Sequence, residues 1–230
     1  MTNIVILTGA GISAESGLGT FRDEGGLWAQ HRIEDVATPE GFSRNPQLVH
    51  DFYNARRAQA ADASPNPAHH ALTKLEEKLD GSLLIVTQNV DSLHEKAGSK
   101  AVLHMHGQLD RALCSACDHR WDAPLVMAPT DACPACSAPQ TRPDIVWFGE
   151  IPYQMDRIAD ALSRADVFVS IGTSGEVYPA ANFVAEADHF GAHTIELNLE
   201  PSAGASRFAE CRFGPASEIV PAWVAEKLSR

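Results

Sequence analysis

The chain has 230 residues, 44% of them hydrophobic, and its 18 Lys and Arg stand against 30 Asp and Glu, for a formal net charge of −12. This length can bury one substantial core with a small appendage, so we expect a single main domain over residues 1–230. The acidic charge argues against nucleic acid as a partner, because the field of the protein repels phosphates. No apolar run approaches the roughly 20 residues that span a bilayer, and residues 3–7 lack the basic lead and cleavage site of a signal peptide. We therefore expect a cytoplasmic protein without membrane contact.

Short apolar runs alternate with stretches of helical spacing along the chain. The runs lie at residues 3–8, 82–87, 167–171 and 193–198. Each is typical of a buried parallel strand. Helical spacing falls between them, for example at residues 67–79 and 153–165. This alternation predicts an α/β fold with a Rossmann-like, doubly wound parallel sheet.

Two segments interrupt the alternation. Residues from about 24 to 65 carry polar helical stretches with several Arg and His and no sheet-like run, which predicts a helical insertion. Residues from about 111 to 141 are rich in Ala, Pro and Cys and have no strong period, which predicts a small inserted module. The Rossmann-like part would then comprise about 1–23, 66–110 and 142–230.

A glycine-rich segment follows the first predicted strand. Its residues fit the pattern G-x-G-x-x-G/A and are Gly9, Ala10, Gly11, Ile12, Ser13 and Ala14. Such glycines let the backbone approach a pyrophosphate, and a helix N-terminus supplies free N–H groups and a positive dipole end. The pattern alone also fits an ordinary glycine-rich turn. No second strand ends in an acidic residue at the spacing usual for dehydrogenases, which argues against a nicotinamide-linked oxidoreductase.

Four of the five cysteines form two Cys-x-x-Cys pairs, Cys114 with Cys117 and Cys133 with Cys136, separated by fifteen residues. This spacing is typical of a four-cysteine zinc site, with a redox pair as the alternative. Four thiolates complete a tetrahedron and leave no position for water. We therefore expect one structural Zn²⁺ in a zinc ribbon, and no chemistry at the metal. Cys211 stands apart as a bystander thiol.

Further motifs extend the pattern over nearly the whole chain. They are Glu15-Ser16-Gly17, Phe21-Arg22, Gln88-Asn89-Val90-Asp91, His106-Gly107, Val146-Trp147-Phe148-Gly149-Glu150, Gly172-Thr173-Ser174, Asn198-Leu199-Glu200 and Gly214-Pro215-Ala216-Ser217. With the glycine-rich segment and the paired cysteines, they resemble the sirtuins in order and spacing. The resemblance implies a Rossmann-like large domain, a zinc-ribbon small domain, and NAD consumed as a co-substrate in the removal of acyl groups from lysine.

The resemblance also implies which residues bind NAD. They are Gly9, Ala10, Gly11, Ile12, Ser13, Ala14, Glu15, Phe21, Arg22, Trp28, Gln88, Asn89, Val90, Asp91, Gly172, Thr173, Ser174, Asn198, Leu199, Glu200 and Ala216. Asn89 and Asp91 would orient the nicotinamide and its ribose as part of the catalytic set, and Asn198 and Glu200 would hold the adenosine ribose. Taken alone, Asn89 and Asp91 also fit a polar turn or a helix cap.

His106 is the expected general base, which would draw a proton from a ribose hydroxyl. Histidine suits this role because its unperturbed pKa lies near neutrality. His104 is the competitor, since both side chains share one face of an extended segment. Only His106 precedes a glycine, as the catalytic histidine of the sirtuins does.

Tyr53 and Arg56 lie three residues apart and share one face if their segment is helical. Together they could bind a carboxylate, because an Arg side chain forms two hydrogen bonds with a carboxylate and a phenol adds one more. A Tyr-x-x-Arg pair does this in the sirtuin branch that removes succinyl and malonyl groups, and the resemblance implies deacetylation as well. A solvated Arg beside a core aromatic is the alternative.

The substrate peptide is expected to lie as an added strand between two strand-like segments, residues 146–150 and 175–178. The residues expected at this contact are Val146, Phe148, Gly149, Glu150 and Val177. The expected partners are therefore acyl-lysine proteins or peptides, and a monomer is compatible with the sequence. A deacetylase without acidic-acyl activity, an ADP-ribosyltransferase and an NAD-sensing module are the alternative functions.

Overall fold

The computed structural model of the chain describes residues 1–19 and 27–229. Its centre is a parallel sheet with the strand order β3-β2-β1-β7-β8-β9. The strands are β1 (Thr2–Thr8), β2 (Gly81–Thr87), β3 (Val102–His104), β7 (Val167–Ile171), β8 (His193–Asn198) and β9 (Glu210–Phe213). Because the strand order reverses on the two sides of β1, the carboxyl ends of β1 and β7 form the switch point where such sheets bind ligands. The four predicted strands are confirmed, and the short edge strands β3 and β9 were not predicted.

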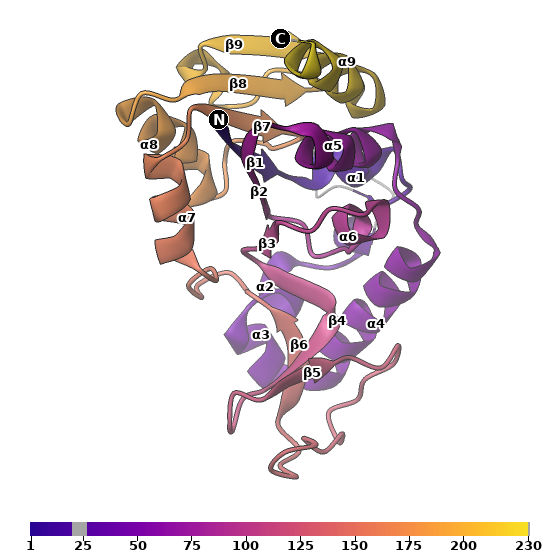
Figure 1. The fold of residues 1–230 in the computed structure, drawn as a ribbon. Coiled ribbons are helices and arrows are strands. Elements are labelled where there is room, and N and C mark those ends of the chain that lie inside the picture. The colour runs from indigo at the N-terminus through magenta and orange to yellow at the C-terminus, as the bar shows by residue number, and fades with distance from the viewer. Residues whose placement is uncertain (20–26, 230) are drawn as a thin grey trace.

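Helices cover both faces of this sheet (Figure 1). On one face lie α5 (Pro67–Lys78) and α9 (Ala216–Leu228), and on the other α7 (Met155–Ser163) and α8 (Phe183–His189). The predicted helices at 67–79 and 153–165 thus form as α5 and α7. Shorter elements near the strand ends are α1 (Ala10–Ala14), α6 (Leu93–Ala97), η2 (Ala180–Asn182) and η3 (Ala205–Arg207).

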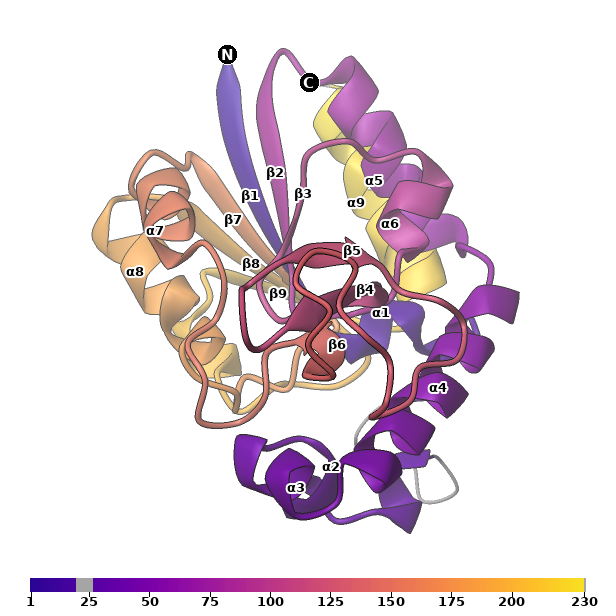
Figure 2. The same ribbon diagram turned by 90° about the horizontal axis from the view of Figure 1, so that it is seen from below.

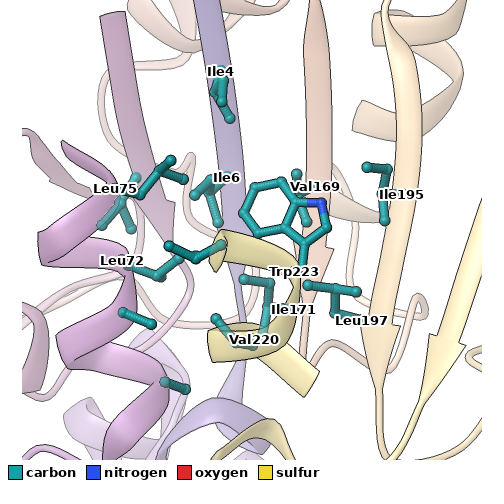
Figure 3. Packing of buried hydrophobic residues seen from close by; sticks show 14 of the residues in the cluster. Ile4, Ile6, Leu72, Leu75, Val169, Ile171, Ile195, Leu197, Val220 and Trp223 are labelled. Atoms are coloured by element: carbon teal, nitrogen blue, oxygen red, sulfur yellow. The ribbon is translucent and has the colours of Figure 1, made fainter. Parts of the chain in front are cut away.

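The side chains of β1 alternate between two cores. Ile4 and Ile6 join the cluster under α5 and α9, whereas Val5 and Leu7 join the cluster under α7 and α8. This is why the strand is a continuous apolar run in the sequence. Figure 3 shows Trp223 of α9 against the first face of the sheet, and each fully buried side chain of this kind contributes about 1.5–3 kcal/mol.

A second, antiparallel sheet has the order β5-β4-β6. Its strands are β4 (Gly107–Cys114), β5 (Arg120–Asp122) and β6 (Thr141–Ile145). Cys114 is the last residue of β4 and Cys117 lies in the loop that follows, whereas Cys133 and Cys136 lie in the loop before β6. The sheet begins at Gly107 and ends at Ile145, outside the expected module at 111–141, because β4 and β6 continue to pair beyond the cysteine loops.

The segment before α5 is helical. It contains η1 (Leu27–Gln30), α2 (Ile33–Val36), α3 (Pro39–Arg44) and α4 (Pro46–Asp62). The side chains of Thr38 and Asn45 accept backbone N–H groups at the starts of α3 and α4, each followed by a proline at the first helical position. Figure 2 shows α2, α3 and α4 beside the small sheet, where they share a buried cluster with β4 and β6. In residues 1–19 and 27–229, no helix has the length and apolar character needed to cross a bilayer.

Two buried histidines lie where α5 and α6 meet the large sheet. His69 and His94 are 0% and 1% exposed, and their ring centroids are 5.0 Å apart. Burial lowers the pKa of His69 to about 4, with a smaller contribution from His70. Burial also lowers the pKa of His94 well below its usual value, assisted by His69 and His104. Both rings are therefore neutral in the folded protein near pH 7.

We expect the protein to lose stability in acid because these histidines are kept neutral. Each takes up a proton more readily in the unfolded chain, where its pKa is about 6.5, so this stability is fully present above pH 6.5 and is lost as the pH falls toward 4. For His69 the full effect is roughly 3 kcal/mol. Urea unfolding at pH 7 and pH 5 measures it.

His69→Gln is the matched variant for this test. His69 stands at the third position of α5, where its ring accepts the backbone N–H of Asn66 in a capping box. Glutamine can keep that hydrogen bond but does not titrate. The free energy of unfolding of His69→Gln should fall less between pH 7 and pH 5. Equal losses in the variant and the wild type would contradict the assignment.

Candidate functional site

The glycine-rich turn after β1 packs directly on the end of β7. Gly9 donates its N–H to the carbonyl of Ile171 at 3.0 Å, and Gly11 donates to the carbonyl of Gly172 at 2.9 Å. Gly172 has a φ of +63°, and a Cβ there would lie 2.4 Å from the nitrogen of Ile12. A Cβ on Gly11 would lie 2.7 Å from the Cα of Gly172. No side chain therefore separates the two turns, and the switch point is lined by bare backbone, as close approach of a pyrophosphate requires.

The first helix, α1, carries the rest of the glycine-rich motif. Ile12 and Ser13 are buried, whereas Ala14 and Glu15 are exposed. The carboxylate of Glu15 accepts hydrogen bonds from the backbone N–H and the hydroxyl of Ser217 at the start of α9. Glu15 thus stabilises the N-terminus of α9, where a negative charge is favourable. Phe21 and Arg22 lie outside the described residues.

A buried hydrogen-bond network ties the loop after β2 to this turn. The amide of Asn89 donates to the carbonyl of Gly9 at 3.0 Å and to the hydroxyl of Ser13 at 3.1 Å. That hydroxyl in turn donates to the carboxylate of Asp91 at 3.1 Å. The other oxygen of Asp91 accepts the N–H of Leu93 at 3.0 Å, so Asp91 also closes the turn before α6. The network fixes both side chains at the switch point.

Burial raises the pKa of Asp91, and the hydrogen bonds from Leu93 and Ser13 oppose this shift. Its neighbour Val90 points instead into the core shared with α4. Gln88 is half-buried and lies on the wall of a pocket at the ends of β1 and β7. Val177, expected at the substrate, lines the same pocket. The predicted group Gln88–Asp91 therefore presents its polar side chains to the switch point and its apolar one to the core.

The structure distinguishes His106 from His104. In His104, Nδ1 donates to the carbonyl of Asn89 at 3.2 Å and Nε2 to the carboxylate of Glu95 at 2.7 Å. Burial lowers the pKa of His104, but the hydrogen bond and charge of Glu95 outweigh it, so the pKa is raised. Both nitrogens are engaged and the ring favours its charged form, so His104 is unsuited to accept a proton.

His106 has the opposite arrangement. Its Nδ1 lies 3.2 Å from the carbonyl of Gln88, and because a carbonyl can only accept, Nδ1 carries the proton. The lone pair is therefore on Nε2, for which no hydrogen bond is found in the described part of the chain. Burial lowers the pKa of His106, opposed by the bond to Gln88. The ring is neutral near pH 7 and can act as a base.

Gly107 explains why a glycine follows His106. The chain leaves the large sheet at β3 and enters the small sheet at β4, with Gly107 at a φ of +82°. A Cβ at this position would lie 2.0 Å from the carbonyl oxygen of Asp144. The backbone of His106 also accepts the N–H of Val146 at 2.9 Å. The histidine is thus held at the junction of the two sheets.

Tyr53 and Arg56 share one face of α4. Tyr53 is 1% exposed, and its hydroxyl accepts the indole N–H of Trp147 at 3.0 Å. The guanidinium of Arg56 lies over the ring of Trp28, 4.9 Å from its centroid, and 5.8 Å from the centroids of Phe52 and Tyr53. Trp28 is a residue expected to bind NAD, and its ring packs against the guanidinium of Arg56.

Electrostatics place this pair close to the switch point. Burial lowers the pKa of Arg56, and the nearby Tyr53 and Asp91 oppose the shift. Burial raises the pKa of Tyr53, so its hydroxyl stays protonated and can donate a hydrogen bond. Arg56 is half-buried, whereas Tyr53 is enclosed. The arrangement offers a cation and a phenol to an anionic group.

The residues expected at the adenosine end lie at the ends of β7 and β8. Asn198 donates its amide to the carbonyl of Thr173 at 2.8 Å, which ties the two strand ends together. The hydroxyl of Ser174 accepts the N–H of Glu176 at 3.2 Å. Leu199 and Glu200 are exposed, and Ala216 is the first residue of α9. The side chains that the sequence separates are thus gathered at one edge of the sheet.

The expected strands at the peptide contact do not form. β6 ends at Ile145, and the N–H of Glu150 closes a turn onto the carbonyl of Trp147 at 3.0 Å. The carboxylate of Glu150 accepts two hydrogen bonds from Arg142, at 2.7 and 2.9 Å, which requires this turn. Residues 175–178 are also not a strand, since Gly175 adopts a φ of +72°.

Of the other residues expected at the peptide contact, Phe148 is 47% exposed and Gly149 adopts a φ of +92° with open space around it. Both therefore remain accessible. Glu150, in contrast, already has its partner in Arg142. Arg142 was not singled out from the sequence, because an Arg in a run of polar residues carries no signal of burial.

The four paired cysteines converge. The sulfur atoms of Cys114, Cys117, Cys133 and Cys136 all lie within 4.8 Å of one another. Two of the distances are 3.7 and 3.8 Å. A tetrahedron with Zn–S bonds of about 2.3 Å has S···S edges of about 3.8 Å. The donor set and its spacing fit a closed zinc site.

The two cysteine loops repeat one geometry. The carbonyl of Cys114 accepts the N–H of Asp118, and that of Cys133 accepts the N–H of Ser137. Asp118 and Ser137 have φ values of +57° and +62°. Each loop thus folds by the same left-handed turn and aims both of its thiols at one point. His119 stacks on Trp121 and is outside the cluster.

A doubly wound sheet with a glycine-rich first turn, joined to a small sheet with four clustered cysteines, defines a dinucleotide-binding fold with a zinc-ribbon module. The model of the Sir2 family matches residues 9–179. An NAD-dependent protein deacylase of Caulobacter vibrioides is 58% identical over an alignment of 231 positions that covers 99% of this chain and 97% of the relative. The chain therefore belongs to the Sir2 family.

Solved structures agree with this assignment. A Sir2 homologue in complex with NAD matches with a TM-score of 0.89 at 36% identity, over 98% of this chain and 90% of that one. Sir2 bound to an acetylated peptide matches with a TM-score of 0.84 at 28% identity, over 97% of this chain and 92% of that one. The similarity includes both the large sheet and the zinc-ribbon module.

Proposed function

We propose that this protein is an NAD-dependent protein-lysine deacylase that removes succinyl, malonyl and acetyl groups from lysine side chains. Nicotinamide, O-acyl-ADP-ribose and free lysine would be the products. Membership of the Sir2 family and the deacylase names of its relatives support the reaction class. The observation that carries the proposal is the neutral His106 at the junction of the two sheets, whose Nε2 has no hydrogen-bond partner among residues 1–19 and 27–229.

Bound NAD would supply an activated ribose carbon for the acyl oxygen, with nicotinamide as the leaving group. Asn89 and Asp91 orient the nicotinamide and its ribose from the buried network at the switch point. Nε2 of His106 takes a proton from a ribose hydroxyl, and its Nδ1–H stays bound to the carbonyl of Gln88. The bond to Gln88 keeps one tautomer, so the base needs no reorientation during the reaction.

The backbone at Gly9, Gly11 and Gly172 forms the cradle for the pyrophosphate. A Cβ at any of these positions would fill the space between the two turns, which supports the fit to a dinucleotide. Asn198 and Glu200 hold the adenosine ribose in this proposal, with Ala216 at the adenine.

Tyr53 and Arg56 bind the carboxylate of an acidic acyl group. Arg56 is half-buried, with its guanidinium near three aromatic rings and in hydrogen-bond contact with the Tyr53 side chain, so a carboxylate that accepts the Tyr53 O–H would also reach the N–H groups of Arg56. The alternative role of a solvated helical Arg fits this position poorly, because burial shifts its pKa.

We expect Arg56→Met to lower the ratio of desuccinylation to deacetylation by roughly 10- to 100-fold. The change removes charge-assisted hydrogen bonds, worth about 1.5–3 kcal/mol, that only an acidic acyl group can form. Values of kcat/KM for matched succinyl-lysine and acetyl-lysine peptides give the ratio. An equal loss of both activities would refute carboxylate recognition by Arg56.

Mass-spectrometric turnover of the same two peptides, with and without NAD, tests the whole proposal. NAD-dependent loss of succinyl supports both the reaction and the acyl specificity, and loss of acetyl alone keeps the reaction only. Nicotinamide release without loss of an acyl group points to ADP-ribosyl transfer, and binding of NAD without turnover to an NAD-sensing module.

The same proposal includes acyl-lysine proteins as substrates and a cytoplasmic location. Four thiolates that hold zinc, and no disulfide among the described cysteines, suit a reducing compartment. The exposed Phe148 and Gly149 lie beside the site where a substrate peptide would bind through its backbone.

A further inference from the structure

Trp147 contacts Tyr53, one of the two residues proposed to bind the acyl carboxylate. Its indole N–H donates to the hydroxyl oxygen of Tyr53 at 3.0 Å. The residues come from different parts of the chain, since Tyr53 lies on α4 and Trp147 lies two residues after the end of β6. They are 1% and 2% exposed. The hydrogen bond is therefore shielded from water.

The indole of Trp147 is held on its face and at its backbone. The guanidinium of Arg142 lies over the ring at 3.4 Å from its centroid. Arg142 is fixed by two hydrogen bonds to Glu150 and by one to the carbonyl of Ile145 at 2.6 Å. Glu150 also accepts the backbone N–H of Trp147 at 2.8 Å. The indole N–H thus points in one fixed direction, toward Tyr53.

This donor determines what Tyr53 can bind. A phenol has one O–H to donate and lone pairs that accept. Trp147 occupies the accepting side, and burial raises the pKa of Tyr53 and keeps it protonated. The O–H, which has no acceptor among the described residues, can therefore bind an incoming acceptor. The nearby guanidinium of Arg56 also only donates. The two groups together select an anionic acceptor over a donor or an apolar group.

We propose that Trp147 is a positioning residue for the acyl carboxylate, acting through the hydroxyl of Tyr53. Its indole N–H orients the phenol so that the O–H points to the carboxylate that Arg56 binds. The inference rests on the proposed acyl specificity and adds a residue that does not itself touch the substrate. Arg142 and Glu150 hold Trp147 in place, Arg142 through its contact with the indole face and Glu150 through the backbone N–H of Trp147.

Trp147→Phe tests the inference, because phenylalanine keeps an aromatic ring for Arg142 and removes the N–H donor, together with part of the buried indole volume. We expect the ratio of kcat/KM for desuccinylation to kcat/KM for deacetylation to fall five- to tenfold. The fall should come from a higher KM for the succinyl peptide. In the background of Tyr53→Phe, the same substitution should leave this ratio unchanged. This double-mutant cycle separates an effect through the hydroxyl from an effect of packing.

An independent readout uses the indole N–H resonances. Trp223 is the matched control, since its buried indole nitrogen has no hydrogen-bond partner in the described part of the structure. Tyr53→Phe should shift the indole resonance of Trp147 and leave that of Trp223 in place. This measurement needs no turnover, and an unmoved Trp147 resonance would overturn the inference.

The kinetic outcomes are distinguishable. If Tyr53→Phe and Arg56→Met both leave the acyl preference unchanged, the proposed specificity fails, and the inference with it. If those variants lose the preference and Trp147→Phe keeps it, the inference alone fails. If Trp147→Phe lowers the ratio equally with and without the Tyr53 hydroxyl, Trp147 acts through packing, which also overturns the inference.

Discussion

Replacing His106 by Ala is expected to lower deacylation by roughly 10²- to 10⁴-fold, the usual contribution of a positioned general base. The half-buried ring lies at the junction of the two sheets, and its Nε2 has no hydrogen bond in the described part of the chain. The fold and the zinc content should be unchanged. Peptide turnover by mass spectrometry, a thermal melt and zinc analysis of the same preparation check this.

The pH profile gives a second view of the same residue. Because the base acts when neutral and burial lowers the pKa of His106, the acid limb of kcat/KM should lie below pH 6.5. His70→Ala, an exposed histidine on α5, is the control and should turn over normally. Near-complete activity in His106→Ala would remove the general-base role.

Loss of zinc is expected to have the largest effect on stability. Structural zinc contributes about 10–16 kcal/mol of apparent binding free energy in isolated zinc fingers, as much as the whole stability of many domains. Cys136→Ser should therefore abolish stoichiometric zinc and lower the Tm by about 10–20 °C, because a loss of 5 kcal/mol already shifts it by that amount. Zinc analysis and a thermal melt measure both.

Activity should fall with the zinc, although the ion performs no chemistry. The side chain of Asn54 on α4 makes two hydrogen bonds to the backbone of Met127, at 2.8 and 2.9 Å, in the cysteine module. Arg57 donates to Leu109 of β4 at 2.6 Å. The helix that carries Arg56 thus rests on the module. Cys211→Ser is the control, because Cys211 lies on β9, at the end of the molecule away from the small sheet (Figure 1). An unchanged Tm in Cys136→Ser would contradict the structural role of the zinc.

The sequence predicted what depends on local patterns. The apolar runs marked the long central strands, because residues buried on both faces leave no polar alternation. The edge strands β3 and β9 were not predicted, because a run of three or four residues is too short to show a period. The cysteine spacing predicted the zinc cluster because ligand geometry constrains the chain on either side of the metal.

What the sequence did not predict depends on contacts between distant residues. The glycine after His106 distinguished it from His104 in the sequence, but the charge of each ring depends on its partner in the fold, Glu95 for His104 and Gln88 for His106. The expected strand at 146–150 failed because Glu150 bonds to Arg142, a pairing that no spacing rule contains. Such side-chain pairings require the fold before they can be assigned.

The position of β1 has a consequence for how the chain folds. Among the strands of the large sheet, β1 is synthesised before the other five but lies in the middle, between β2 and β7. Its residue Ile4 pairs with Val167, roughly 160 residues later. At about 5–20 residues per second, the ribosome needs on the order of 10–30 s to supply that second neighbour. Until then the central strand has an unpaired edge, so the NAD-binding switch point is completed only after the zinc-ribbon module has been made.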